Sequence, residues 1–301
     1  MRHRLLSLAL MILCAASCAR DAGPARDRRP VVGVSLLTQT HAFFKALEEG
    51  LREEAEARGL ELVVVACEMD PARQAAQIED FVAQRVSAIL LAPCDSSAVG
   101  PHLLGPERAG IPVFTADIAA RSGKVVSHVA SDNVQGGRLA AQAMAEFIGG
   151  AGDVLIIDHP TVASVQDRVR GFEEEIRQHP GIRLVGKPSS DGQRARAMAV
   201  MEDMLQAHPR LKGVFGINDD SALGATAVLE AAGRKDVVVI GYDATEEAQQ
   251  AITRGGPLKA DVVQYPRRIG RTAIEMIARH LKGEQVPAVA PIEVGLWKKG
   301  S

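Results

Sequence analysis

The chain has 301 residues, of which 47% are hydrophobic and 24% are charged, so it is long enough for one large domain or two of ordinary size. Its formal net charge is −2, which leaves no basic excess to neutralise phosphates and argues against a nucleic-acid partner. Aromatic residues make up only 3% of the chain, so each aromatic in a suggestive position is informative.

The first residues have the pattern of an export signal. Two arginines precede an apolar run at 5–16, which is too short to anchor the chain in a bilayer. Small residues then lead to Cys18, and this order resembles a bacterial lipoprotein signal, in which that cysteine becomes lipidated. Ordinary cleavage after Ala19 is the alternative. We therefore expect a signal peptide at 1–18, a flexible polar leader at 19–30, and export to the periplasm or cell envelope.

From residue 31 onward, apolar strand-like runs alternate with segments of helical periodicity. The predicted strands cover 31–36, 61–65, 88–91, 111–114, 125–129, 153–157, 182–186, 212–217 and 236–240. The predicted helices cover 42–58, 71–84, an irregular segment near 97–109, 133–148, 165–178, 193–207 and 219–232. Such alternation favours an α/β fold with parallel sheets covered on both faces. About ten strands exceed what one such sheet usually holds, so we expect two doubly wound lobes with a boundary near 130–133.

Two cysteines remain outside the export signal, and each follows a predicted strand. Cys67 and Cys94 could pair in an oxidising compartment. In a doubly wound sheet, however, a third strand lies between their two strands, a separation that a disulfide does not bridge. We therefore expect two buried thiols, although the sequence alone does not decide whether they stay reduced.

Polar side chains recur directly after the predicted strands, where doubly wound sheets bind ligands. They are Gln39 and His41, Asp95 and Ser96, Asp117, Asp158 and His159 with Arg168 nearby, Asn218 to Asp220, Asp243 and Gln264, and an aromatic pair, Phe43 and Phe44, accompanies the first of them. Carboxylates and amides accept from neighbouring hydroxyls, arginine donates through a planar fork, and a phenyl ring covers the C–H face of a sugar. The set indicates a site for a polyhydroxylated ligand.

Each of these residues also has a structural explanation. Phe44 has helical spacing to Leu47 and so could be a core residue. Asp219 or Asp220 could cap the helix that follows it. The prediction of a site therefore depends on the shared location of these side chains.

Motifs of catalysis are missing from the sequence. It has no GxSxG elbow, no GxxxxGK[ST] loop and no GxGxxG after a strand, and its histidines lack the spacing of metal ligands. We therefore expect no enzyme activity, no cofactor and no metal.

Five motifs give the chain a resemblance to the periplasmic sugar-binding proteins of bacterial importers, specifically the ribose-binding-protein-like group. They are VVSHVASDNVQGG (125–137), RVRGF (168–172), AHPRLKGVFGINDDSALGA (207–225), VVVIGYDAT (237–245) and VVQYP (262–266), and the likeness covers residues 31–296. The resemblance implies the type I periplasmic binding protein fold, in which two doubly wound lobes are joined by a three-stranded hinge. The implied lobes are 31–131 plus 265–291 and 132–264 plus 292–301, with the hinge near 131–133, 262–265 and 291–294.

The resemblance also implies roles for individual residues. Phe43 and Phe44 match the pair that stacks on the sugar, Asp117 the carboxylate of the first lobe, Arg168, Asn218 and Asp243 the polar groups of the second lobe, and Gln264 the hinge amide. It implies that Asn218 contacts the ligand while Asp219 or Asp220 caps the helix.

Three positions depart from the ribose binders of this group. These have asparagine in place of His41, arginine in place of Ile118 and an aromatic residue in place of Gly192. The changes remove donors at one end of the sugar and one wall of the cleft. They favour another pentose or hexose, a deoxy sugar, a polyol or a small signalling furanose as the ligand.

The resemblance implies a monomeric solute-binding protein that closes around a sugar or polyol and delivers it to the permease of an ABC importer. It would meet the membrane itself only through a lipid anchor on Cys18. The alternative is the same fold serving as the ligand receptor of a chemoreceptor or sensor kinase. A repressor with this fold is disfavoured because a signal peptide occupies the place of its DNA-binding helices.

Overall fold

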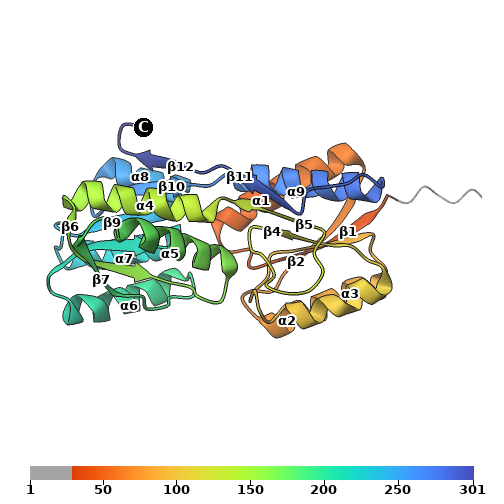
Figure 1. The fold of residues 1–301 in the computed structure, drawn as a ribbon, viewed down its shortest axis with the longest axis horizontal. Helices are drawn as coiled ribbons and strands as arrows, with labels where there is room; N and C mark the ends of the chain where they lie inside the picture. The colour runs from red at the N-terminus through yellow and green to blue at the C-terminus, as the bar shows by residue number, and fades with distance from the viewer. Residues whose placement is uncertain (1–28) are drawn as a thin grey trace, which may run out of the picture.

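Two six-stranded sheets organise residues 29–301, the part of the chain that the computed structural model describes (Figure 1). In spatial order the first sheet consists of β11 (Val289–Ile292), β5 (Ser127–Ser131), β4 (Val113–Ala116), β3 (Ala88–Leu91), β1 (Val31–Leu36) and β2 (Glu61–Ala66). The second consists of β12 (Gly295–Lys298), β10 (Leu258–Val263), β9 (Val238–Asp243), β8 (Leu211–Gly216), β6 (Ala151–Ile157) and β7 (Gly181–Gly186). All neighbouring strands are parallel except β10 and β12. The predicted doubly wound α/β fold is confirmed.

Helices cover the sheets of both lobes, which lie end to end in Figure 1. Around the first sheet these are α1 (Ala42–Arg58), α2 (Pro71–Gln84), the 3₁₀ turn Gly100–Leu103 with α3 (Leu104–Ala109), and α9 (Pro266–Leu281). Around the second sheet they are α4 (Asn133–Ile148), α5 (Ala163–Ile176), α6 (Arg194–Ala207), α7 (Asp219–Ala231) and α8 (Glu246–Arg254). None of the helices within 29–301 is long and apolar enough to cross a membrane.

Six of the predicted helices agree with the structure to within about two residues, whereas the irregular segment predicted near 97–109 is a 3₁₀ turn at Gly100–Leu103 followed by α3. Strands β4, β5 and β9 each begin two residues later than predicted. The apolar run at 111–114 suggested a strand that starts at Ile111. Pro112 has no N–H for a strand ladder, and the strand instead extends through Thr115 and Ala116, which are buried.

The chain crosses between the lobes at three places. It leaves the first sheet after β5 to enter α4, returns after β10 to enter α9, and passes from β11 to β12 at 293–294. Helix α9 packs closely on α1, because a Cβ on Gly50 would lie 2.3 Å from the carbonyl oxygen of Arg267. A late segment of the chain thus completes the first lobe.

The expectation that Cys67 and Cys94 stay unpaired was wrong, because the structure joins them in a disulfide with Cα atoms 6.9 Å apart. Strand β1 does lie between β2 and β3, as the topology predicted. However, both cysteines lie beyond the ends of their strands, and Cys94 comes three residues after Leu91. The two loops therefore meet over the end of β1, where no strand separates them.

The predicted signal peptide at 1–18, with Cys18, lies outside the described residues, as does most of the predicted leader at 19–30.

Candidate functional site

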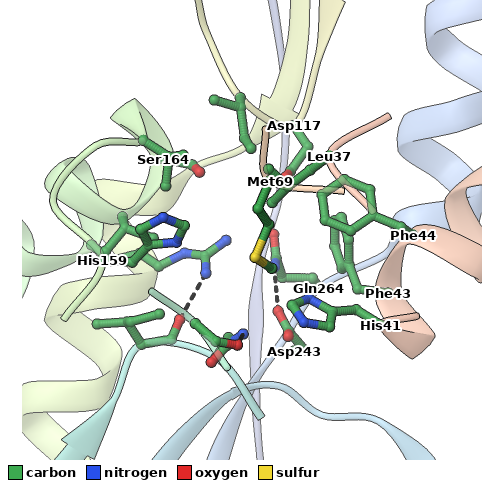
Figure 2. Close-up of a pocket in the computed structure, with 17 residues that line it drawn as sticks. Leu37, His41, Phe43, Phe44, Met69, Asp117, His159, Ser164, Asp243 and Gln264 are labelled. Carbon is green, nitrogen blue, oxygen red and sulfur yellow. Dashed lines mark hydrogen bonds between the residues drawn. The ribbon is translucent and has the colours of Figure 1, made fainter. Parts of the chain in front are cut away.

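A pocket between the two lobes brings together nine side chains that the sequence predicted for a ligand site. These are His41, Phe43, Phe44, Asp117, Ile118, Arg168, Asn218, Asp243 and Gln264. Other members of the predicted polar set do not line it: Gln39, Asp95, Ser96, Asp158, Asp219 and Asp220. Figure 2 shows His41, Phe43 and Phe44 on one side of the pocket, His159 and Ser164 on the other, and Asp243 and Gln264 between them. The pocket therefore draws on both lobes and on a crossing between them.

The aromatic wall of the pocket comes from the first turn of α1. The rings of Phe43 and Phe44 meet edge to face, with centroids 5.2 Å apart, and both side chains are buried. Both rings belong to the hydrophobic core and also line the pocket, so the core position expected for Phe44 does not exclude it from the site. Two fixed rings provide an apolar surface suited to the C–H face of a small ligand.

Asp117 follows β4 and supplies a buried carboxylate from the first lobe. Its backbone has φ of 65°, an uncommon value for a residue other than glycine. Its Oδ1 is buried and has no hydrogen-bond partner among the described residues. Burial raises the pKa of Asp117 to about 6, against the opposing effect of Arg168. Oδ1 of Asp117 is therefore a buried acceptor that no described residue satisfies.

Arg168 projects from α5 and is fixed by three contacts. Its Nε donates to Oδ1 of Asn133 at 2.8 Å, its Nη1 donates to the carbonyl oxygen of Ile217 at 2.7 Å, and its guanidinium lies 3.9 Å from the centre of the Tyr242 ring. Close packing of α4 on α5 holds this arrangement, because a Cβ on Gly137 would lie 2.0 Å from the Arg168 carbonyl oxygen. The side chain is thus a preorganised donor and positive charge in the pocket.

Asp243 and Gln264 are joined directly. Nε2 of Gln264 donates to Oδ1 of Asp243 at 2.7 Å, which leaves Oε1 of Gln264 buried without a partner among the described residues. Burial raises the pKa of Asp243 well above its usual value, and the neighbouring Asp219 raises it further. The pair presents further acceptors at the point where β10 leads into α9.

Asn218 caps helix α7 in addition to lining the pocket, a capping role that the sequence assigned to Asp219 or Asp220. Its backbone is extended, and its Oδ1 accepts from the Ser221 N–H at 2.9 Å, which makes Asn218 the N-cap of α7. Its Nδ2 donates to the carbonyl oxygen of Gly192 at 3.0 Å. Asp219 instead accepts from the Thr245 N–H, and Asp220 pairs with Arg194. The expectation that Asp219 or Asp220 caps this helix was therefore wrong.

Sequence reasoning did not assign several residues that line the pocket. They are Leu37, Met69, Val162, Ser164, Val165 and Ile217, whereas His159, which the sequence placed in the polar set, and Gly192 also line it. Helical spacing could have identified Ser164 and Val165, which precede Arg168 by four and three residues on α5. His159 is held neutral near pH 7, because burial lowers its pKa to about 4, with further lowering by His41 and Arg168.

The lobes also touch beside the pocket. The Ser96 N–H donates to the carbonyl oxygen of Thr161 at 3.1 Å, and the Ala163 N–H donates to Oγ of Ser96 at 2.9 Å. Ser96 belongs to the first lobe and its two partners to the second, so the structure has its lobes closed over the pocket. Within 29–301, no three histidine, cysteine or acidic side chains come together as a metal site would require.

Known proteins share this fold and much of this sequence. Residues 32–285 match the family described as periplasmic binding protein domain. The ribose import binding protein RbsB of Escherichia coli strain K12 is 35% identical over 90% of this chain and 91% of its own length.

Two solved structures are similar over nearly the whole fold. An ABC transporter solute binding protein from Mycobacterium smegmatis, with bound glycerol, is 36% identical with a TM-score of 0.86, covering 90% of this chain and 94% of that one. One from Agrobacterium vitis, bound with α-D-tagatopyranose, is 27% identical with a TM-score of 0.86, covering 90% of this chain and 95% of that one.

These relatives and structural neighbours are solute-binding proteins of ABC importers and not enzymes, which confirms the predicted class of function. The match implies an exported, periplasmic protein, as the N-terminal pattern predicted. With its two closed lobes and the pocket between them, the chain belongs to the periplasmic binding protein family.

Proposed function

We propose that this protein binds a neutral monosaccharide or a related polyol between its lobes and delivers it to the permease of an ABC importer. The main support is a pair of buried acceptors that have no partner among the described residues, Oδ1 of Asp117 and Oε1 of Gln264. Buried polar groups in proteins are normally hydrogen-bonded, and both residues line the pocket. Ligand hydroxyl groups are suited to donate to these acceptors.

The charges of the pocket favour a neutral ligand. Asp117 and Asp243 carry carboxyl groups, against the single guanidinium of Arg168. A sugar acid or a sugar phosphate would add negative charge to buried carboxylates, which is unfavourable. The rings of Phe43 and Phe44 supply the apolar contact that the C–H groups of a sugar require.

Ligand capture then follows from closure. Side chains of both lobes reach the ligand together only when the lobes are closed, so the ligand stabilises the closed form. We propose lobes of 31–131 plus 265–291 and 132–264 plus 292–301, with the hinge at the three crossings near 131–133, 262–265 and 291–294. We further propose a monomer that a lipid on Cys18 tethers to the membrane.

A thermal-shift screen of the mature chain tests the proposed function. The panel contains D-ribose, D-apiose, D-arabinose, D-allose, D-tagatose, xylitol, myo-inositol and glycerol, with D-gluconate and D-ribose 5-phosphate as anionic controls. A ligand at a thousand times its Kd stabilises the folded protein by about 4 kcal/mol, which is readily seen. A shift with one neutral compound supports the proposal, whereas a shift only with an anion, or with none of the panel, contradicts it.

A further inference from the structure

Two buried carboxyl groups lie beneath the turn Asp243–Thr245, which carries one of the pocket's acids. Asp219 is the first residue of α7 and Asp261 lies within β10, and both side chains are buried. Oδ2 of Asp219 accepts from the Thr245 N–H at 2.7 Å, and Oδ1 of Asp261 accepts from the Ala244 N–H at 3.0 Å. Two successive amides of the turn are therefore held by acids from two different elements.

The backbone of this turn has unfavourable dihedral angles that require stabilising contacts. Asp243 has φ of 121° and Ala244 has φ of 53°, and neither residue is a glycine. Side-chain-bearing residues keep such angles only where the surroundings impose them. The turn also sets the position of the Asp243 carboxylate in the pocket. The hydrogen bonds that Asp219 and Asp261 accept from this turn thus help to position the Asp243 carboxylate, although Asp261 itself does not line the pocket.

The other oxygens of the two acids point to a proton between them. Oδ1 of Asp219 and Oδ2 of Asp261 are both buried without a hydrogen-bond partner among the described residues, while the second oxygen of each acid accepts from one of two successive amides of the same turn. Each carboxyl group also acts on the pKa of the other. Gly241 leaves room for the Asp261 carboxylate, because a Cβ there would lie 2.3 Å from its Oδ2. Two ionised carboxylates have no proton to donate and repel each other when buried, whereas one shared proton satisfies both.

The charged neighbours do not supply an alternative to that proton. Asp243 of β9 and Asp220 of α7 add negative charge beside the pair. The nearby cations are already engaged: Arg194 of α6 pairs with Asp220 and with Glu247 of α8. His41, directly before α1, faces Asp220. Arg168 of α5 and Asp117, which follows β4, act on Asp243, and Lys298 of β12 pairs with Glu146. Burial, followed by mutual repulsion, raises the pKa of Asp261 well above its usual value.

We propose that Asp219 and Asp261 share one proton and that this pair is a positioning device, which fixes the Asp243–Thr245 turn and thereby the carboxylate of Asp243 in the pocket. The role in capture rests on the proposed function. The shared proton and the held turn do not, because both can be measured without any ligand.

The first test compares the pH dependence of stability in the wild type and in Asp261→Asn. The asparagine keeps an oxygen for the Ala244 N–H and brings its own N–H for Asp219, so it needs no shared proton. A pKa raised in the folded state stabilises fully below the ordinary aspartate value of about 3.9, and this stabilisation is lost as the pH rises through the folded value. Urea unfolding between pH 5 and 8 gives the free energy of unfolding as a function of pH. This free energy should fall with rising pH more steeply in the wild type than in Asp261→Asn, by the slope that corresponds to about one proton.

Asp117 and Asp243 are present in both proteins, so the difference between the two slopes reports the pair. Asp80→Asn is the matched control, because Asp80 is an exposed aspartate on α2, and this variant should keep the wild-type slope. Equal slopes in the wild type and in Asp261→Asn would overturn the shared proton.

The second test measures hydrogen exchange at the amides of Ala244 and Thr245 in the ligand-free protein. Asp261→Asn should keep both amides protected, whereas Asp261→Ala should speed exchange at Ala244 by about tenfold or more, since each factor of ten reports about 1.4 kcal/mol of local stability. Wild-type protection in Asp261→Ala would overturn the held turn. If Asp261→Ala fails to fold, the slope comparison with Asp261→Asn still decides the proposal.

The third test extends these variants to binding, using whichever compound of the neutral panel binds the wild type. Asp261→Asn should stay within about threefold of the wild-type Kd at pH 7, and Asp261→Ala should weaken binding by about tenfold or more. Equal weakening in both variants would contradict positioning through hydrogen bonds. If the wild type binds none of the panel, the proposed function fails, while the two ligand-free measurements still decide the proton and the turn.

Discussion

His41 of the first lobe faces Asp220 of the second lobe across the mouth of the pocket, with Nε2 3.4 Å from Oδ2. Asp220 also accepts from Nε of Arg194 at 2.9 Å, and Arg194 forms a two-pronged pair with Glu247. The last three residues belong to the second lobe, so His41 is the part of this network that separates when the lobes open. The contact is therefore specific to the closed form.

The protonation of His41 bears on closure. Burial lowers its pKa from 6.5, and the positive charge of Arg194 lowers it further, while Asp220 and Glu68 oppose this effect without cancelling it. Opening of the lobes would separate His41 from Asp220 and expose the imidazole, so its pKa would return toward the ordinary value. As the pH falls below about 6.5, the open form takes up a proton that the closed form resists, so closure becomes less favourable.

We predict that the affinity of the wild type for its sugar or polyol falls between pH 7.5 and pH 5.5, and that His41→Asn removes part of this decrease. Asparagine keeps a polar group at the mouth but does not titrate. The measurement is the Kd by calorimetry at four pH values in both proteins. A steeper decrease in His41→Asn than in the wild type would contradict this role for His41.

Asp117→Asn is expected to separate binding from stability. The change removes a charged acceptor from the pocket and should weaken binding by about 1.5–3 kcal/mol, or roughly ten- to a hundredfold. The pKa of Asp117 is raised to about 6 in the folded protein, so its ionisation costs stability as the pH rises toward 6. Asp117→Asn avoids this cost and should be more stable than the wild type at pH 7.5, by about 3 kcal/mol.

Calorimetry and urea unfolding of the same preparation check both halves of this prediction. At pH 4.5, where Asp117 is protonated in the folded wild type, the difference in stability should shrink. A variant that binds as tightly as the wild type would remove Asp117 from the site. A variant that is less stable at pH 7.5 would contradict the cost assigned to burial of the charge.

Asn218 combines a cap and a pocket contact, and two substitutions separate these roles. Asn218→Ser keeps a good N-cap for α7, so its stability should stay close to that of the wild type, whereas Asn218→Ala should lose about 1 kcal/mol. Both variants lose the amide that faces the pocket, and both should bind more weakly. Binding that follows stability, with Asn218→Ser equal to the wild type in both, would show that Asn218 is a cap alone.

Much of the site could be predicted because the fold and the polar pattern share one geometry. Alternation of strands and helices fixed the edge of each sheet at which ligands bind, and Asp117, Asp243 and Gln264 follow strands at that edge. The aromatic pair could be found for the same reason, since Phe43 and Phe44 lie in the first turn after β1.

What could not be predicted depends on contacts between distant segments. Asp261 reads as one polar residue in a strand, and only the packing of α7 on β9 and β10 brings it to Asp219. Met69 enters the pocket from a loop after β2 whose backbone has positive φ at both Glu68 and Met69, which no propensity suggests. Strand order does not predict the disulfide, because Cys67 and Cys94 lie in loops beyond the ends of β2 and β3.

That disulfide gives the last prediction. Cys67 and Cys94 close a loop with a sequence separation of 27, and a loop of this size is worth about 3–4 kcal/mol of stability in the chain-entropy account. Dithiothreitol should therefore lower the Tm of the wild type and leave that of a Cys67→Ala, Cys94→Ala double variant unchanged. The loops that the bridge ties together also carry Met69, which lines the pocket, so reduction should weaken binding as well.

Mass spectrometry after alkylation of the exported protein gives the direct check. Two free thiols on Cys67 and Cys94 in freshly purified protein would contradict the bridge. A Tm that does not respond to reductant would contradict its contribution to stability.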